Sequence, residues 1–298
     1  MLKYQYSDTT HSPSGILAMA KNDESKRDHW SSEAYKSAAG FVPKLTSTVV
    51  SYLDPQPNDN ILDIGCGDGQ LTEQIAHQLS GKGQILGLDA SLSFIKTAAA
   101  EHKPNNVRYR HQDCTKLMED QEVQTAKFNK VFSNAALHWI LRNPETRVEV
   151  FRDMHTALEP GGKLVFEMGG KGNVTEVHVA FIAALVAQGV SLDAAREASP
   201  WFFPSVEWMS KTLTDVGFDV EKCELEYRPT KCTADGQGGG LDGWLRLMGA
   251  QFLEAVSADK RDEVVRSVCD MLETVITREE DGSKWLGYVR LRAVARKR

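Results

Sequence analysis

No part of this 298-residue sequence is apolar enough to cross a membrane. A spanning helix needs roughly 18 or more consecutive apolar residues, and no window of the chain approaches that length. Residues 1–20 include Tyr, Asp, Thr, His and Pro without an apolar core, so they do not resemble a secretory signal. We therefore expect a cytoplasmic protein that has no membrane partner.

Cysteine is scarce, and its spacing indicates neither disulfides nor a metal. The five cysteines are an odd number and contain no CxxC pair, which is typical of free thiols in a reducing compartment. The eight histidines are scattered, and none has a ligand-type spacing to a cysteine or a carboxylate. We therefore predict no metal site.

The sequence also lacks an excess of positive charge. It has 35 Lys and Arg against 41 Asp and Glu, a formal net charge of −6. Nucleic-acid binding needs a concentrated positive face, so we do not expect a nucleic-acid partner. The basic segment 290–298 is interpreted as a solvated final strand.

The composition is that of a globular protein, with 41% hydrophobic and 26% charged residues. Residues 1–29 are polar and aperiodic, which predicts a disordered tail. From Trp30 onward, apolar residues recur at near-helical spacing and predict one or two helices before Pro55. We expect residues 30–298 to form one domain.

Strand and helix patterns alternate through the first half of that domain. Strands are predicted at 60–64, 85–88, 107–111, 128–133 and 163–168, and helices at 71–79, 91–101 and 145–158. Alternation with short connections is typical of βαβ units, which give a parallel sheet with helices on both faces.

The alternation of predicted strands and helices ends after Gly170. Helices are predicted at 174–189, 206–216, 241–256 and 259–276, and strands at 218–227 and 285–295. We interpret segments near 171–205 and 236–280 as helical insertions that form a cap. Five aromatic side chains are candidate walls for an organic ligand: Trp201, Phe202, Phe203, Trp208 and Trp244.

The segment Asp63-Ile64-Gly65-Cys66-Gly67-Asp68-Gly69 follows the first predicted strand. Glycine at every second position lets a backbone turn sharply and approach a ligand closely. A dinucleotide site would have GxGxxG, but Gln70 occupies the third glycine's place. The pattern by itself leaves a generic tight turn as an alternative.

Polar residues also end the next three strands. Asp89 ends the second; its carboxylate can accept the hydroxyls of a ribose, of NAD or another nucleoside, or can cap the following helix. Asp113 follows the third strand and Asn134 the fourth. Because ligands of open α/β sheets bind beyond the carboxyl ends of the strands, these residues are predicted to converge on one nucleoside.

Together these motifs resemble the class I S-adenosylmethionine-dependent methyltransferases. Residues 133–139, Ser-Asn-Ala-Ala-Leu-His-Trp, are similar to the trans-aconitate methyltransferase group, and juvenile-hormone acid methyltransferases carry a similar His-Trp pair. The resemblance implies a Rossmann-like sheet of seven mostly parallel strands, with the last antiparallel. It also implies S-adenosyl-L-methionine as donor and S-adenosyl-L-homocysteine as product.

The resemblance further implies roles for single residues. Gly65, Gly67 and Gly69 would contact the methionyl part, Asp89 the ribose, Asp113 with Cys114 the adenine, and Asn134 with Ala135 the sulfonium region; Asp63, Cys66 and Ala90 belong to the same site. Trp30 and Tyr35 would form a lid, or pack against the sheet. His138 and Trp139 would face the methyl acceptor.

We expect a small-molecule acceptor, with a carboxylate oxygen as first choice. A carboxylate has a reference pKa of about 4 and needs no general base at neutral pH. A phenol, amine or thiol would benefit from a base, for which His138 is the candidate; otherwise His138 orients the acceptor. The alternatives are N-, S- or C-methylation, a nicotinamide-dependent oxidoreductase, and a non-catalytic binding protein. We expect a monomer or homodimer.

Overall fold

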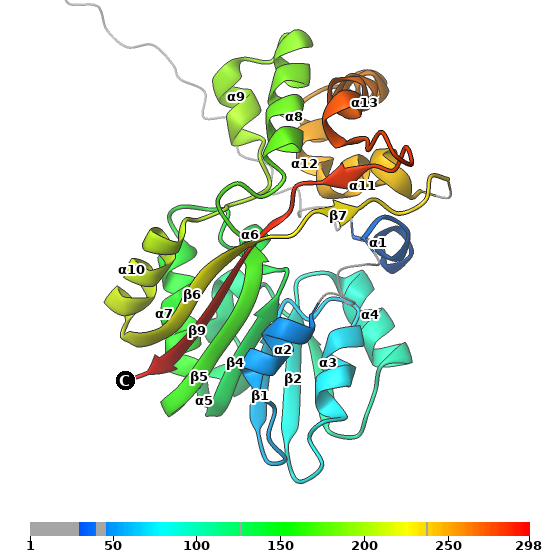
Figure 1. Cartoon of the computed structure of the whole chain (residues 1–298). Coiled ribbons are helices and arrows are strands. Elements are labelled where there is room, and N and C mark those ends of the chain that lie inside the picture. Colours follow the sequence, from blue (N-terminus) through cyan, green and yellow to red (C-terminus); the bar gives the residue numbers. More distant parts are fainter. Residues whose placement is uncertain (1–29, 40–45, 126, 237) are drawn as a thin grey trace, which may run out of the picture.

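The computed structural model describes residues 30–39, 46–125, 127–236 and 238–298. Its centre is a seven-stranded sheet in the order β3-β2-β1-β4-β5-β9-β6 (Figure 1). The strands are β1 (Asn60–Ile64), β2 (Gln84–Asp89), β3 (Val107–His111), β4 (Phe128–Asn134), β5 (Leu158–Gly169), β6 (Phe218–Tyr227) and β9 (Val289–Lys297). Strands β1 to β5 are parallel, whereas β9 runs antiparallel to both of its neighbours. The predicted fold class is confirmed.

Helices cover both faces of the sheet because alternate side chains of its central strands are apolar on both sides. Ile61 packs with α2 (Ser47–Leu53) and α3 (Gln70–Ala76). The next residue, Leu62, packs on the opposite face. That face is covered by η2 (Cys114–Glu119), α5 (Gln121–Thr125), α7 (Arg147–Ala157) and α10 (Val206–Val216). Helix α4 (Leu92–Glu101) contacts β2 and β3.

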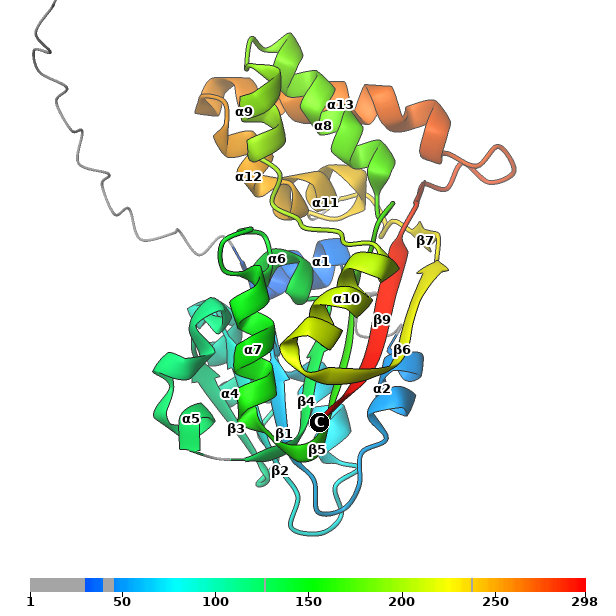
Figure 2. The ribbon, with the colours of Figure 1, turned by 90° about the vertical axis from the view of Figure 1, so that its left-hand side faces the viewer.

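Further helices lie beyond the carboxyl ends of the parallel strands and form a cap (Figures 1 and 2). They are α8 (Thr175–Ala187), α9 (Leu192–Glu197), α11 (Gly240–Met248), α12 (Ala250–Glu254) and α13 (Arg261–Ile276). The cap has its own apolar core, in which Phe181 and Phe252 stack with ring centroids 4.7 Å apart. Helix α1 (Ser32–Ala39) lies between the cap helix α11 and α4. The helices predicted within 171–205 and 236–280 are therefore present, together with α9, which was not predicted.

The prediction of one continuous strand at 285–295 is wrong. Trp285–Leu286 forms a short strand, β8, that pairs with β7 (Thr230–Lys231) in a separate two-stranded sheet. The chain leaves this pairing at Gly287, whose N–H donates to Glu176 of the cap at 2.7 Å, and enters the large sheet at Val289.

The interpretation of segment 290–298 as a solvated strand is also wrong. Because β9 lies between β5 and β6, it is an interior strand, and Arg290 and Arg292 are each only 4% exposed. Only the last arginines, Arg296 and Arg298, are exposed. The predicted tail, 1–29, lies outside the described residues, as does Gln237 of the glycine-rich run.

Candidate active site

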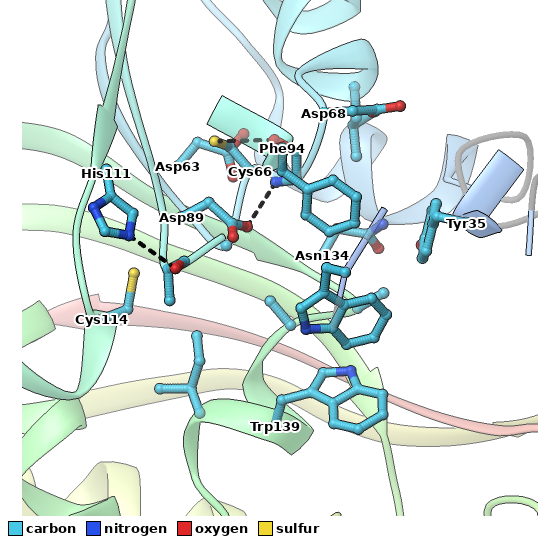
Figure 3. Close-up of a pocket in the computed structure, with 18 of the residues that line it drawn as sticks. Tyr35, Asp63, Cys66, Asp68, Asp89, Phe94, His111, Cys114, Asn134 and Trp139 are labelled. Carbon is cyan, nitrogen blue, oxygen red and sulfur yellow. Dashed lines mark hydrogen bonds between the residues drawn. The ribbon is translucent and has the colours of Figure 1, made fainter. Parts of the chain in front are cut away.

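A cavity of about 420 Å³, the large cavity, opens at the carboxyl ends of β1 to β4 (Figure 3). This is the point at which the strand order reverses between β1 and β4, the usual ligand position in open α/β sheets. Thirteen predicted site residues line it: Trp30, Tyr35, Asp63, Gly65, Cys66, Gly67, Asp89, Ala90, Asp113, Cys114, Asn134, Ala135 and Trp139. Two predicted residues, Gly69 and His138, do not.

The glycine-rich turn forms the floor of the large cavity. Gly65 and Gly67 have φ of +72° and +58°, a region that side chains other than glycine rarely adopt. A Cβ at Gly65 would lie 2.1 Å from that of Ala136, so glycine lets the loops after β1 and β4 meet. A Cβ at Gly67 would contact no protein atom within 4 Å and would point into open space.

Gly69, which was predicted to contact the ligand, lies outside the lining of the large cavity. A Cβ at this position would lie 2.8 Å from the Tyr109 hydroxyl and 2.9 Å from the Ala98 Cβ, both outside the cavity lining. Gly69 precedes α3 with a φ of +88°, so it serves the turn into that helix and its packing against β3 and α4.

Asp89 holds the glycine-rich turn in place. One carboxylate oxygen accepts the Gly67 N–H at 2.9 Å, and the other accepts the Ser91 N–H at 2.8 Å. Ser91, rather than Asp89, caps α4 by accepting the Phe94 N–H at 3.2 Å. The helix-cap alternative for Asp89 is therefore wrong, and its carboxylate faces the cavity beside the turn (Figure 3).

Asp63 lies beneath this turn and is 3% exposed. Its Oδ2 accepts a hydrogen bond from the Thr72 hydroxyl at 2.7 Å. Burial raises the pKa of Asp63 to about 7, and the nearby charge of Asp89 adds to the shift. A positively charged ligand group nearby would favour the ionised carboxylate.

Asn134 ends β4 and carries a buried polar atom that no described residue satisfies. Its Oδ1 is buried, has no hydrogen-bond partner among the described residues and belongs to a side chain that lines the large cavity. Leaving such an oxygen unpaired is costly, which indicates a ligand that donates to it. The next residue, Ala135, has a φ of +57°, and its N–H donates to the Glu167 carbonyl at 2.8 Å.

Aromatic rings close the large cavity on the side of the cap. Trp30 contacts Trp139, Phe94 and Tyr35, with centroids 5.1, 5.8 and 6.2 Å apart. Phe94 was not predicted as a site residue. It lies in the first turn of α4, the helix that follows the predicted strand-end residue Asp89. No role was predicted for the other lining residues: Asp68, Gln70, Leu71, His111, Thr115, Ala136 and Ile140.

A second cavity of about 50 Å³, the small cavity, lies between the sheet and the cap. It shares Trp30, Tyr35, Ala135 and Trp139 with the large cavity. Its other lining residues are His138, Asn173, Val174, Trp201, Phe203, Trp244, Met248, Tyr288 and Arg290. The two cavities therefore meet at one shared wall, and His138 belongs to the smaller.

Three of the five predicted aromatic walls line the small cavity, and Phe202 and Trp208 do not. These two rings pack against each other, with centroids 4.9 Å apart, at the edge of the main core. The Arg147 guanidinium lies over the Phe202 ring at 3.7 Å. Trp201 and Phe203 thus face the small cavity, whereas Phe202 between them packs against the main core.

The imidazole of His138 is buried in a defined protonation state. Its Nδ1 accepts the Gly169 N–H at 3.3 Å, so the proton of the neutral ring is on Nε2. Burial lowers the pKa of His138 well below its usual value, and the charge of Arg290 lowers it further. At neutral pH this ring offers a hydrogen-bond donor at Nε2.

Membrane-spanning helices and metal-binding clusters are both absent from the described part of the chain. No helix there has the length and apolar character needed to span a membrane. No group of three or more His, Cys, Asp and Glu side chains is arranged to hold a metal ion within the same ranges.

The sheet order, the antiparallel β9 and the strand-end site are those of the class I methyltransferase fold. A methyltransferase domain model matches residues 61–162, from β1 into β5. An uncharacterized methyltransferase of Schizosaccharomyces pombe, C70.08c, is 36% identical over 270 residues, which are 91% of this chain and 98% of that protein. The chain belongs to the class I S-adenosylmethionine-dependent methyltransferases. This assignment replaces the nicotinamide-dependent and non-catalytic alternatives.

More distant relatives agree with this assignment. A trans-aconitate 2-methyltransferase of Acidovorax ebreus is 24% identical over 246 residues, covering 82% of this chain and 88% of the relative. A crystal structure of a Bacillus halodurans C-125 protein superposes with a TM-score of 0.57 at 14% identity, covering 85% of this chain and 99% of the other. This last likeness concerns the fold alone.

The large cavity fits S-adenosylmethionine, the donor that this family uses. Its volume lies within the roughly 300–1,000 Å³ of small-molecule pockets. The Oδ1 of Asn134 can accept a hydrogen bond from a ligand, and the open space at Gly67 accommodates a ligand against the backbone. The acidic side chains of Asp63, Asp68 and Asp89 suit a donor that carries positive charge.

Proposed function

We propose that this methyltransferase methylates a carboxylate oxygen of a small organic acid. The observation that carries the proposal is the state of His138, the imidazole at the cavity beside the donor site. Its Nδ1 accepts a backbone N–H, its Nε2 bears the proton, and burial keeps it neutral.

The dimensions of the site support a small acceptor. The small cavity of about 50 Å³ compares with the roughly 10–15 Å³ that one water molecule needs on the same measure. It therefore has room for a small chemical group such as a carboxylate, and buried aromatic rings such as Trp201 and Trp244 enclose it. These walls favour an organic molecule over a nucleic acid or a protein segment.

Proton chemistry selects the carboxylate among small acceptors. No aspartate or glutamate is among the described residues that line the small cavity. Burial raises the pKa of Tyr35, so its hydroxyl stays protonated. Because none of these lining groups accepts a proton at neutral pH, the geometry favours an acceptor that is already ionised, such as a carboxylate with a pKa of about 4.

The chain's part in the reaction is to bind, align and exclude water. We assign the donor to the turn at Gly65 and Gly67, with Asp89 at the ribose, Asp113 near the adenine and Asn134 near the methionyl part. When bound, S-adenosylmethionine would supply an electrophilic methyl group to the acceptor oxygen, with the electron pair of the carbon–sulfur bond left on sulfur and no proton released. Alignment of this kind contributes about 7–11 kcal/mol to a barrier reduction.

Two residues at or beside the shared wall are proposed to align the acceptor. The Nε2–H of His138 is the donor that would hold a carboxylate oxygen, and Trp139 separates the two cavities and limits the approach. The named substrate of the Acidovorax relative, trans-aconitate, is also a carboxylate. Cytoplasmic residence and a monomeric or homodimeric state remain predictions from the sequence.

Proton release tests the proposal directly. The full-length protein is supplied with S-adenosylmethionine and panels of small carboxylates, phenols, amines and thiols, and S-adenosylhomocysteine is quantified. In weak buffer with a pH indicator, we expect turnover of a carboxylate without proton release and a base-labile methyl ester as product. Turnover restricted to phenols, amines or thiols, with about one proton released per methyl group, would overturn the proposal and favour O-methylation of a phenol or the N- or S-methyltransferase alternative.

A further inference from the structure

Two arginines of β9 and Arg228, which directly follows β6, meet at one buried glutamate. Glu167 of β5 accepts hydrogen bonds from Arg228 at 2.8 Å, Arg290 at 3.0 Å and Arg292 at 2.6 Å. Arg290 and Arg292 are two apart on β9 and share one face of the sheet. Glu167 is paired in register with Arg292, and Gly169, which has no side chain, is paired with Arg290.

Within this cluster, Arg290 pairs with one described carboxylate, which two other arginines also bind. Arg292 has a second partner in Glu226, whereas the ion pair of Arg290 among the described residues is with Glu167, which the other two arginines also bind. Buried charges are normally matched by opposite charges, since an unmatched one loses its hydration without compensation. The incomplete match at Arg290 therefore indicates an anion that completes it.

Arg290 is also the member of the cluster that reaches the small cavity. It is 4% exposed and lines that cavity, whereas Arg228 and Arg292 do not. Its side-chain hydrogen bond among the described residues joins Nε to Glu167, and the two terminal nitrogens have no described partner. A guanidinium held at Nε presents its terminal N–H groups as a fixed pair of donors, which matches a carboxylate.

We propose that Arg290 is the specificity-determining residue of the acceptor site and binds the acceptor's carboxylate through its terminal nitrogens. Glu167 is a positioning residue that fixes Nε and turns this end of the side chain toward the cavity. The inference rests on the proposed function and deepens it, because it names the group that distinguishes an acid from its neutral analogues. Each carboxylate oxygen has two lone pairs, so an oxygen that accepts a hydrogen bond from Arg290 can still attack the methyl group through its other lone pair.

The difference in charge between the acid and its methyl ester also accounts for product release. The carboxylate arrives with a negative charge that pairs with Arg290, whereas the methyl ester is neutral and loses the ion pair. Arg290 is thereby expected to exclude both the product ester and amide analogues.

Calorimetry on the full chain tests this role without turnover. Protein saturated with S-adenosylhomocysteine is titrated with acetate, propanoate, butanoate and benzoate, and with the corresponding primary amides and methyl esters. Wild-type protein is expected to bind at least one acid about 10- to 100-fold more tightly than its amide, the effect of one charge-assisted hydrogen-bonded pair. R290Q is expected to lose this preference while its affinity for S-adenosylhomocysteine stays within about twofold, because Arg290 does not line the large cavity.

R290K and R228Q complete the design. R290K keeps the charge but not the paired donors, so it should retain a preference for the acid at reduced affinity. If R290Q no longer binds S-adenosylhomocysteine, the acid preference of R290K tests the role of Arg290 in its place. R228Q removes another arginine from Glu167 without touching the cavity, and should keep most of the preference. Acid binding unchanged in both Arg290 variants overturns the inference and leaves the proposed function standing. A wild-type protein that binds and methylates no acid, but does methylate a phenol or amine, overturns both.

Discussion

The large cavity is lined by loops that leave consecutive strands, whereas the small cavity is lined by side chains from distant parts of the chain. In the large cavity backbone groups and short side chains dominate, as at Gly67, Asp89 and Asn134. In the small cavity long side chains meet from the short helix α6 (Leu137–Ile140), the cap and β9: His138, Trp244 and Arg290. A backbone-built donor site is compatible with many acceptors, because the acceptor side can change without disturbing it.

The two cavities also differ in the sign of their charge. Asp63, Asp68, Asp89 and Asp113 line the large cavity, where the described lining includes no lysine or arginine. Arg290 lines the small cavity, where the described lining includes no acidic side chain. A cationic methyl donor and an anionic acceptor would thus each meet the opposite charge, with Ala135 and Trp139 at the boundary.

Asp89→Ala is expected to have the largest effect on the donor side. It removes charge-assisted contacts proposed to bind the ribose, at about 1.5–3 kcal/mol each, and it releases the Gly67 N–H. We expect S-adenosylhomocysteine binding to fall below detection by calorimetry, with the protein still folded by circular dichroism. Affinity equal to wild type would contradict the ribose assignment.

Gly67→Val separates steric intrusion from backbone strain. Its side chain would project into the open space of the large cavity, and donor binding should be lost. Gly161→Val is a matched control, since Gly161 has a φ of +76°, lies outside both cavities, and would place an added Cβ more than 4 Å from any neighbouring atom. Equal donor affinity in the two variants would mean that the turn at Gly67 does not face the ligand.

The raised pKa of Asp63 predicts that the affinity for the donor, but not for the acceptor, depends on pH. Its pKa of about 7 in the ligand-free protein means that half of the molecules carry a neutral carboxyl at that pH. A cationic donor favours the ionised form, so affinity should rise between about pH 6 and pH 8, by tenfold if binding lowers this pKa by one unit. Calorimetry in buffers of different ionisation enthalpy should show proton release near pH 7, and Asp63→Asn should abolish it.

The thermodynamic linkage between proton binding and folding gives the sign of the corresponding pH effect on the free energy of unfolding. The folded-state pKa is raised above the ordinary value of 3.8, so the folded protein binds more protons than the unfolded chain between these values. The contribution of Asp63 to the free energy of unfolding therefore falls as pH rises from about 4 to 7. Denaturant titrations of ligand-free protein should show this slope, and a slope that persists in Asp63→Asn would assign it to another group.

Gly69→Ala should have the smallest effect on binding, despite its place in the same motif. The added Cβ would meet Tyr109 and Ala98, and a φ of +88° is strained for alanine, so we expect about 1–3 kcal/mol of destabilisation. Donor affinity measured below the unfolding transition should stay near that of wild type. Loss of affinity at unchanged stability would place Gly69 in the donor site after all.

The donor side could be predicted from the sequence because its signals are local. The strands at 60–64, 107–111 and 218–227 have the predicted bounds, and the glycine-rich turn follows β1 as expected. In parallel strands with short crossovers, successive strand ends come together whatever the rest of the chain does. The exception is Gly69, whose spacing matches the motif but whose neighbours on β3 and α4 decide its role.

The residues that line the acceptor side could not be predicted from a linear sequence pattern. Trp201, Phe203 and Trp244 were predicted as walls, but so were Phe202 and Trp208, since hydrophobicity alone cannot tell which face of a segment turns inward. Arg290 was assigned to solvent because a run of basic residues near the chain end is usually exposed. Its burial follows from the insertion of β9 between β5 and β6.

The sequence by itself determined the parallel α/β sheet, the turn after β1 and the acidic residue that ends β2, because each depends on contacts between residues close along the chain or on backbone conformation. Only the tertiary structure decided that Ala135, Trp201, Trp244 and Arg290 surround one small cavity. Their proximity depends on the packing of the cap over the sheet and on the antiparallel entry of β9. Those arrangements come from many weak long-range contacts, which no single segment specifies.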